Sequence, residues 1–261
     1  MIPNMEVEIA GVKWKNPVTV ASGTFGSGME YGEFVDLNKL GAITSKGVAI
    51  YPWEGNATPR VAETPSGMLN AIGLQNPGME VFKNRDIPFM KKYDTVSIVN
   101  VVGKSAEEYI QAVEALSDTD VDMLEINISC PNVKEGGIAF GTDKDVAAAL
   151  TKEIKAHAKQ PVIMKLSPNV TSISEMAKAV EAAGADALSL INTITGMKID
   201  VERQSIFLAN KTGGLSGPAI KPVAVRMVYQ AAQAVKIPII GMGGIANAED
   251  AIEFMLAGAT G

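Results

Sequence analysis

The sequence has little of the chemistry that cross-links small proteins or binds metals. Its 261 residues include one cysteine, Cys130, and one histidine, His157. One thiol excludes an intrachain disulfide framework and any cysteine-ligated cluster that this chain could hold alone. The histidine stands in the polar stretch KEIKAHAK and has no second imidazole with which to share a metal. We therefore predict no metal site and assign no role to His157.

Long apolar runs and an excess of positive charge are also missing. No apolar run is long enough to span a bilayer, and residues 1–17 lack the cationic-then-apolar pattern of a secretory signal. The formal net charge is −6, and there is no basic run. These absences argue against binding to nucleic acid or to an anionic membrane surface, and the expected location is the cytoplasm.

The sequence does contain a regular alternation of strand and helix patterns. Its length is close to the ~250 residues typical of one α/β barrel, so we expect a single domain over residues 1–261. Short β-branched or apolar runs alternate with helical patterns, as in a parallel sheet with crossover helices. The predicted strands are Val18–Ala21, Ala42–Lys46, Val96–Val101, Met123–Ile128, Val162–Leu166, Ala187–Asn192 and Ile237–Gly241.

Several local signals accompany these strands. Helix N-terminal caps are predicted at Ser105, Ser172 and Asn247. The opening VEIAGVKW predicts a hairpin that turns at Ala10 and Gly11 and covers the floor of a barrel. Two long insertions, residues 51–78 and 195–218, follow the second and sixth predicted strands, and loops of that length are usually functional.

Seven predicted strands are one fewer than a closed barrel needs. The sequence stops at GATG, where the next strand would begin, so we expect a TIM (β/α)8 barrel that lacks its last β/α unit in this chain. A doubly wound open sheet is the alternative fold, because alternating strands and helices are typical of that class too.

Polar residues collect at the C-terminal ends of the predicted strands, where barrel enzymes place their chemistry. They are Ser22, Lys46, Asn100, Asn127, Cys130, Lys165, Asn192 and Thr193, with Gly243 and Gly244 after the seventh strand. A single strand-end asparagine is more often a turn former, and a single lysine is usually a solvated charge. Their coincidence at one rim predicts an active site there.

Two stretches at this rim favour particular chemistry. A solitary cysteine is most often inert packing, but Cys130 stands in SCPN, a polar loop with a proline, which favours a reactive thiol. GMGGIA at residues 241–246 fits the G-x-G-x-x-A dinucleotide pattern, yet a Rossmann unit needs a further strand and an acidic residue beyond it. Glycine amides beside a helix N-terminus are more typical here of a phosphate site.

Eight motifs together resemble one enzyme family. They are ASGTFG, TSKGV, NAIGLQNPG, SCPN, IMKLSPN, INT, GGLSGPAIKP and GMGGI. In this combination the sequence is similar, nearly end to end, to the dihydroorotate dehydrogenases. NISCPNVKEGG and NAIGLQNPG resemble class 1B, the catalytic subunit of the NAD-linked enzyme, more than the fumarate-linked class 1A. The resemblance implies oxidation of (S)-dihydroorotate to orotate in de novo pyrimidine biosynthesis.

The resemblance also implies a flavin reaction with a cysteine base. Dihydroorotate loses a proton from C5 and a hydride from C6, and the hydride passes to N5 of FMN. Cys130 resembles the base, because a free thiol titrates at about pH 8.5 and can transfer a proton in both directions; class 2 relatives carry serine instead. Lys165 resembles the lysine that faces the N1 and C2 carbonyl side of the flavin, where reduction builds negative charge.

Binding roles follow from the resemblance by matching position. The implied FMN contacts are Ser22, Lys46, Gly47, Asn100, Asn127, Lys165, Ile191, Gly217, Gly243 and Gly244. The implied substrate contacts are Lys46, Asn70, Ala71, Ile72, Gly73, Leu74, Asn127, Asn132, Asn192 and Thr193. Asparagine suits an imide-like ring because its amide both donates and accepts hydrogen bonds. The segment from Asn70 to Leu74 is expected to cover the substrate.

A partner subunit is implied for the electrons. This chain has too few cysteines for an iron–sulfur cluster and no complete Rossmann unit. The resemblance implies a second subunit that carries FAD and a [2Fe-2S] cluster, docked on a dimer of this chain as a heterotetramer. Two other functions stay open, a flavin-free phosphate-binding barrel that acts as a lyase or isomerase, and a catalytically silent barrel that acts as a binding subunit.

Overall fold

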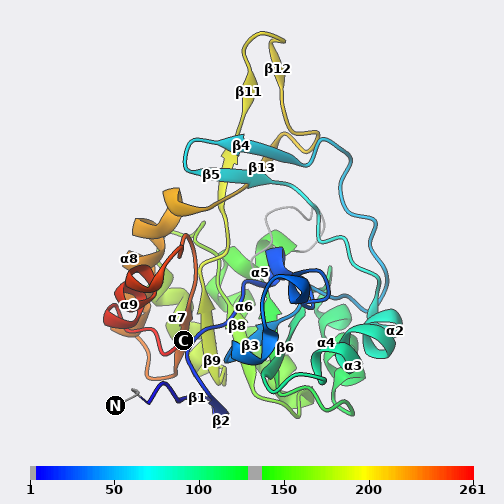
Figure 1. Ribbon diagram of the computed structural model, residues 1–261, viewed down its shortest axis with the longest axis vertical. Coiled ribbons are helices and arrows are strands. Elements are labelled where there is room, and N and C mark those ends of the chain that lie inside the picture. The colour runs from blue at the N-terminus through cyan, green and yellow to red at the C-terminus, as the bar shows by residue number, and fades with distance from the viewer. Residues whose placement is uncertain (1–3, 129–136) are drawn as a thin grey trace.

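The computed structural model of the chain describes residues 4–128 and 137–261. Three parts follow one another along the long axis: a hairpin at the floor, a curved parallel sheet with its helices, and an upper layer of antiparallel strands (Figure 1). The upper layer stands over the end of the sheet where the predicted site residues lie.

A parallel sheet forms the centre of the molecule. Its strands within the described residues are β3 (Ala42–Thr44), β6 (Val96–Val101), β7 (Met123–Asn127), β8 (Val162–Lys165), β9 (Ala187–Leu190) and β14 (Ile239–Gly241). Their order across the sheet is β14-β9-β8-β7-β6-β3, with every neighbouring pair parallel. A doubly wound sheet reverses its strand order at a switch point, and these strands show no reversal. The barrel expectation is confirmed, and the doubly wound alternative is wrong.

The predicted first strand, residues 18–21, is wrong. This segment has no strand assignment. The carbonyl of Val18 accepts hydrogen bonds from both Gly41 N–H (2.9 Å) and Ala42 N–H (3.3 Å). In a pair of β-strands, successive carbonyl and amide groups along both strands take part in hydrogen bonds. Here both donors go to one carbonyl, so the hydrogen-bond pattern of a strand pair is not formed. The chain turns instead into helix α1 (Ser22–Phe25).

The opposite edge of the sheet is extended by residues 260–261. Thr260 N–H donates to Ile239 O at 2.7 Å, and Gly241 N–H donates to Gly261 O at 2.8 Å, so these residues lie beside β14. A Cβ added at Gly261 would lie 3.3 Å from Pro17 O, close to the segment that borders β3. The two edges of the sheet therefore approach each other at the floor, as they do in a barrel.

Helices cover the outer face of the sheet. The longer ones are α4 (Ala106–Leu116), α6 (Lys144–His157), α7 (Ile173–Ala182), α8 (Lys221–Ala232) and α9 (Ala248–Leu256). The predicted caps at Ser105, Ser172 and Asn247 are confirmed, since each side chain accepts a hydrogen bond from the backbone N–H three residues on. The short ones are α2 (Met79–Val81), α3 (Ile87–Met90), α5 (Gly137–Thr142), the π-helix η3 (Phe82–Asp86) and the 3-10 helices η1 (Tyr31–Glu33), η2 (Leu37–Lys39) and η4 (Pro218–Ile220).

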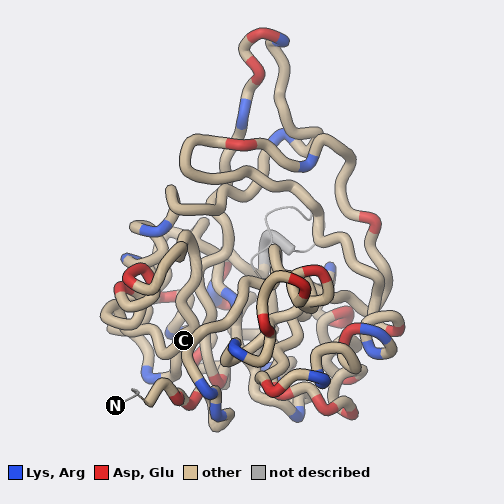
Figure 2. Tube along the Cα trace, viewed as in Figure 1, with Lys and Arg blue, Asp and Glu red and all other residues tan. Residues whose placement is uncertain are grey.

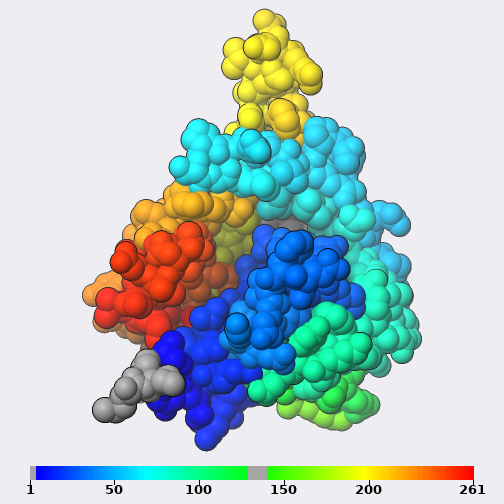
Figure 3. All heavy atoms as spheres, in the orientation of Figure 1, coloured from blue at the N-terminus to red at the C-terminus, as the bar shows by residue number. Residues whose placement is uncertain are grey.

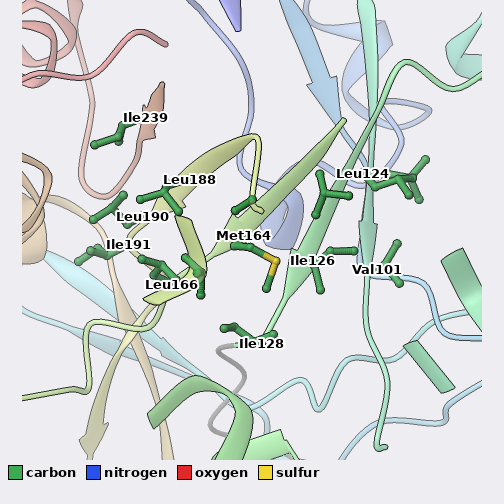
Figure 4. Close-up of a cluster of buried hydrophobic side chains, with 14 of the residues drawn as sticks. Val101, Leu124, Ile126, Ile128, Met164, Leu166, Leu188, Leu190, Ile191 and Ile239 are labelled. Carbon is green, nitrogen blue, oxygen red and sulfur yellow. The ribbon is translucent and has the colours of Figure 1, made fainter. Parts of the chain in front are cut away.

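The main core lies between the sheet and these helices. Alternate strand residues point into it, among them Leu124 and Ile126 of β7, Met164 of β8, and Leu188 and Leu190 of β9 (Figure 4). All five are fully buried. Burial of one such side chain contributes about 1.5–3 kcal/mol. Because the outer face of the sheet supplies this stability, the inner face can carry polar residues.

The floor hairpin is confirmed where the sequence predicts it. Strands β1 (Val7–Ile9) and β2 (Val12–Trp14) pair antiparallel around Ala10 (φ 52°) and Gly11 (φ 80°), as in a type I′ turn. Ile9 and Trp14 are fully buried. They pack on the lowest inward-facing residues of the sheet, which are Ala42, Ile98, Met123, Ile163, Ala187 and Ile240. The hairpin therefore closes the bottom of the barrel with apolar side chains.

The two long insertions meet in the upper layer. Strands β4 (Val61–Thr64) and β5 (Gly67–Asn70) come from the first insertion, and β10 (Ile194–Met197) and β13 (Thr212–Ser216) from the second. They form one antiparallel sheet in the order β10-β13-β5-β4. A hairpin of β11 (Ile199–Asp200) and β12 (Ser205–Ile206) projects above it (Figures 1 and 3).

Charge is distributed over the molecule without separation by sign. Lysine and arginine alternate with aspartate and glutamate along the trace, including the tip of the projecting hairpin (Figure 2). Within residues 4–128 and 137–261, no helix combines the length and apolar character needed to cross a membrane.

Candidate functional site

Alternation along the strands divides the inside of the barrel into layers. In β7, Met123 belongs to the floor cluster and Leu124 to the outer core, so Glu125 and Asn127 point inward. The same alternation turns inward Asn100 of β6, Lys165 of β8 and Ser189 of β9. All of these polar residues are buried. The apolar floor is therefore followed by a polar layer just below the mouth of the barrel.

The centre of the polar layer is a carboxylate that the strand-end pattern missed. Glu125 is 2% exposed. Its oxygens accept hydrogen bonds from Asn100 Nδ2 at 2.5 Å and Ser189 Oγ at 2.8 Å, and Lys165 Nζ lies at 3.5 Å. A buried carboxylate needs such partners because it has lost its hydration. The signal that would have revealed Glu125 is a charge at an inward position of a strand whose neighbours are apolar.

The two predicted lysines stand in different surroundings. Lys165 is buried, and its Nζ donates to Ser22 Oγ at 3.2 Å and to Glu125 Oε1 at 3.5 Å. An ammonium group has three donors, so one N–H of Lys165 is without a partner in the part of the chain that the structure describes. Lys46 is half-buried, and its Nζ donates to Gly23 O at 3.3 Å. Lys165 thus brings a cation inside the barrel, and Lys46 lies at its rim.

A series of asparagine amides leads from the polar layer to the rim. Asn127 Nδ2 donates to Asn100 Oδ1, and Asn192 Nδ2 donates to Asn127 Oδ1, both at 3.4 Å. Thr193 N–H donates to Asn192 Oδ1 at 2.8 Å. The hydroxyl of Tyr109 fixes the end of β7 by donating to Asn127 O at 2.7 Å. The structure therefore brings together four predicted contacts from three segments of the chain.

The predicted cover, residues 70–74, descends from the upper layer to the rim. Asn70 ends β5, and its Nδ2 donates to Gly214 O at 3.4 Å. The side chain of Thr193 packs directly against Gly214 as well, since a Cβ added at Gly214 would lie 1.9 Å from Thr193 Oγ1. At the other end of the cover, Leu74 Cδ2 would lie 3.7 Å from a Cβ added at Gly47. The cover therefore connects the first insertion with the second at Gly214 and with the barrel rim at Gly47.

The middle of the cover is held by Asn56. The side-chain amide of Asn56 donates to Ala71 O, and its backbone N–H donates to Ile72 O, both at 3.0 Å. A Cβ added at Gly73 would lie 2.6 Å from Asn56 N. The carbonyls of Ala71 and Ile72 are therefore engaged with Asn56, which fixes the path of this segment.

Three predicted glycines lie together near the N-terminus of α8. Gly217, Gly243 and Gly244 have φ values of 102°, 127° and 78°. A Cβ added at Gly244 would lie 2.8 Å from Gly217 O, and one added at Gly243 would lie 3.4 Å from Ile191 Cγ1. Such close approach at positive φ requires glycine. A glycine backbone of this kind beside a helix start is typical of a phosphate site.

Two predicted residues, Cys130 and Asn132, lie outside the described residues. They belong to the stretch between β7 and α5. The chain enters that stretch just after Asn127, whose amide is part of the hydrogen-bonded series. Sequence position alone therefore connects them with the site, and their roles stay predictions.

A cavity of about 250 Å³ opens beside the rim at Lys46 and Gly47. Its wall includes Ser27 and Asp86, which are both buried, and Ser27 Oγ donates to Asp86 Oδ1 at 2.5 Å. Sequence patterns gave no sign of this cavity, because its lining comes from three separate parts of the chain.

Comparison with known proteins identifies relatives of the whole chain. The family model described as "Dihydroorotate dehydrogenase" matches residues 4–261. A protein of Lachnoclostridium phytofermentans named "Dihydroorotate dehydrogenase B (NAD(+)), catalytic subunit" is 70% identical over 257 residues, 98% of this chain and 86% of that protein. A protein of the same name from Alkaliphilus metalliredigens is 62% identical over 258 residues, 99% of this chain and 85% of that protein.

A solved structure shares the fold. The crystal structure of DHODH from Eimeria tenella in complex with ferulenol matches with a TM-score of 0.82 at 21% identity, over 98% of this chain and 77% of that chain. A likeness at this identity concerns the fold alone. Because the family model spans nearly the whole sequence and the relatives share well over half of its residues, the chain belongs to the dihydroorotate dehydrogenase family.

Proposed function

We propose that this chain oxidises (S)-dihydroorotate to orotate, as the catalytic subunit of an NAD-linked enzyme of de novo pyrimidine biosynthesis. The observation that carries the proposal is 70% identity, over 98% of this chain, to a relative named as the catalytic subunit of dihydroorotate dehydrogenase B (NAD(+)). The barrel mouth supports it, because a buried ammonium, a series of amides and a glycine-rich backbone lie there.

FMN is the proposed cofactor of this chain, and the described residues fit it. Gly217, Gly243 and Gly244 have the close backbone approach that a phosphate needs. Lys165 has a buried donor left over, which suits a flavin edge that gains negative charge. When bound, FMN supplies the acceptor for the hydride that leaves C6 of the substrate. We infer that residues 1–261 form one domain around this cofactor.

The proposed substrate site uses the amides of the rim and the cover. Asn70, Asn127 and Asn192 offer donors and acceptors for the pyrimidine edge and carboxylate, and Asn132, Thr193 and Lys46 complete the proposed set. The thiolate of Cys130 is the proposed base. It takes the C5 proton, and the electron pair of the broken C5–H bond forms the C5–C6 double bond as hydride leaves C6.

A second subunit is the proposed route from FMN to NAD. Relatives named "catalytic subunit" imply a separate subunit, and their name includes NAD(+). The single cysteine of this chain cannot ligate an iron–sulfur cluster. We infer a partner that carries FAD and a [2Fe-2S] cluster, in a heterotetramer of two catalytic and two electron-transfer chains.

The test is an anaerobic titration of the FMN-loaded, full-length catalytic chain with dihydroorotate. We expect the visible flavin absorbance to disappear as orotate forms. A chain that binds FMN but keeps its colour would contradict the proposed substrate, and a chain that does not bind FMN would contradict the cofactor. Rapid fumarate reduction without a partner would place the protein in class 1A.

A further inference from the structure

We propose that Glu125 is a positioning residue of the flavin site, which holds the ammonium group of Lys165 in place and offsets its charge. The inference rests on the proposed FMN site and adds to it a residue that the implied contacts did not include. Glu125 lies one layer below the mouth, between the apolar floor and the amide of Asn127.

The carboxylate of Glu125 on β7 contacts side chains from three other strands of the sheet at this level. Oε1 of Glu125 accepts from Asn100 of β6 and faces Lys165 of β8, and Oε2 accepts from Ser189 of β9. Hydrogen bonds to an ionised acceptor are short and strong, as the 2.5 and 2.8 Å distances from Asn100 and Ser189 indicate. Because both oxygens are engaged, the carboxylate has a fixed orientation. Lys165 is therefore held between Glu125 and Ser22.

Stability alone does not account for this ion pair. Replacing a buried ion pair by apolar residues of similar volume is often neutral or stabilising. The layer directly below shows that apolar residues fit inside this barrel, since the same two strands carry Met123 and Ile163 there, both fully buried. The charged pair stands instead where the remaining donor of Lys165 can meet a ligand in the mouth. Its position points to a role in ligand binding.

The pair would set the charge beside the reduced flavin. A cation at the N1 and C2 carbonyl side favours reduction, and a carboxylate 3.5 Å from that cation offsets part of the effect. Glu125→Gln removes the negative charge and keeps the shape. The carbonyl oxygen of the introduced amide can still accept from Asn100 and Lys165, and its NH2 group can donate to Ser189 Oγ. The change therefore isolates charge from packing.

The experiment measures the reduction potential of FMN bound to the wild-type chain and to three variants. With Glu125→Gln we expect the ratio of reduced to oxidised FMN at a fixed potential to rise at least about tenfold, which is about 30 mV for two electrons. Glu125→Asp and Ser189→Ala keep the carboxylate charge, so both should shift the potential by less than Glu125→Gln does. An unchanged potential in Glu125→Gln, or an equal shift in Ser189→Ala, would overturn the proposal.

A second measurement needs no flavin and separates this inference from the proposed function. In urea unfolding of the flavin-free chain, Lys165→Met should lower the midpoint because it leaves a buried carboxylate without its cation. Adding Glu125→Gln to Lys165→Met should restore part of the loss. Strictly additive effects would show that Glu125 does not hold Lys165, whereas failure of the wild-type chain to bind FMN would count against the cofactor alone.

Discussion

Replacing Gly244 with alanine tests the glycine-rich backbone as the FMN phosphate site. Gly244 has a φ of 78°, where a β-carbon costs about 1–2 kcal/mol. The added Cβ would also lie 2.8 Å from Gly217 O and 2.9 Å from Lys221 Cβ. Either the segment around Gly217 or the start of α8 must therefore move.

The expected effect is a loss of FMN affinity. The free chain can relax around the new methyl group, but binding of the phosphate requires the original backbone, so the cost enters the binding free energy. Since about 1.4 kcal/mol corresponds to a factor of ten, a cost of 1–2 kcal/mol plus the two close contacts should raise the Kd for FMN by about 10- to 100-fold.

Gly184→Ala provides the matched control. Gly184 also has positive φ, at 104°, but a Cβ there would meet only Lys155 Cγ, at 3.7 Å, just beyond the end of α7. Gly184→Ala should bind FMN like the wild-type chain, whereas Gly244→Ala should weaken FMN binding in a fluorescence titration, because only its added Cβ lies close to the proposed phosphate site. Equal FMN affinity in the two variants would refute the assignment of the phosphate to this backbone.

Three further predictions address the base, the acid stability and the partner. Cys130→Ala should leave FMN bound but slow its reduction by dihydroorotate by about 10²- to 10⁴-fold, and Cys130→Ser should retain a little activity at higher pH; near wild-type stopped-flow rates would place the base elsewhere. A hydrogen bond from Lys221 holds the pKa of the Asp250 carboxyl below its usual value. That contribution to stability is complete above about pH 4 and is lost as pH falls through the lowered pKa. Asp250→Asn should therefore lower the urea midpoint at neutral pH and make the midpoint less dependent on pH in acid. An unchanged dependence of the midpoint on acid pH would contradict this. The full-length catalytic chain alone should reduce artificial dyes with dihydroorotate and reduce NAD only with its partner, so efficient NAD reduction by the isolated full-length chain would be the contrary result.

Features that depend on a few adjacent residues could be predicted from the sequence. The floor hairpin follows from the turn at Ala10 and Gly11 between alternating apolar residues, and the cap at Ser105 follows from its own side chain. The rim residues could be predicted as well, because β3, β7, β8 and β9 end within two residues of their expected ends. Parallel strands then bring these ends to one edge of the sheet.

Features that depend on distant partners could not be predicted in this way. Residues 18–21 have a strand pattern, yet they do not form a strand, because the amides of Gly41 and Ala42 both donate to the one carbonyl of Val18. The pairing of β5 with β13 joins two insertions whose separate sequences carry no sign of each other. Glu125 could have been noticed as a charge at an inward position of an apolar strand, but its contacts with Lys165 and Ser189, which come from two other strands, could not be predicted.

The same alternation that stabilises the barrel also builds its site. Along β7, outward Leu124 and Ile126 bury apolar surface, while inward residues change from Met123 at the floor to Glu125 and then Asn127 at the mouth. A substitution on the outer face therefore acts on stability first, as expected for close-packed side chains. A substitution on the inner face of the upper two layers acts first on charge and hydrogen bonding. We therefore expect Glu125→Gln, which keeps the shape of the side chain, to change the charge and hydrogen bonding of the site more than the packing of the outer core, so that a change in flavin potential can be attributed to the site.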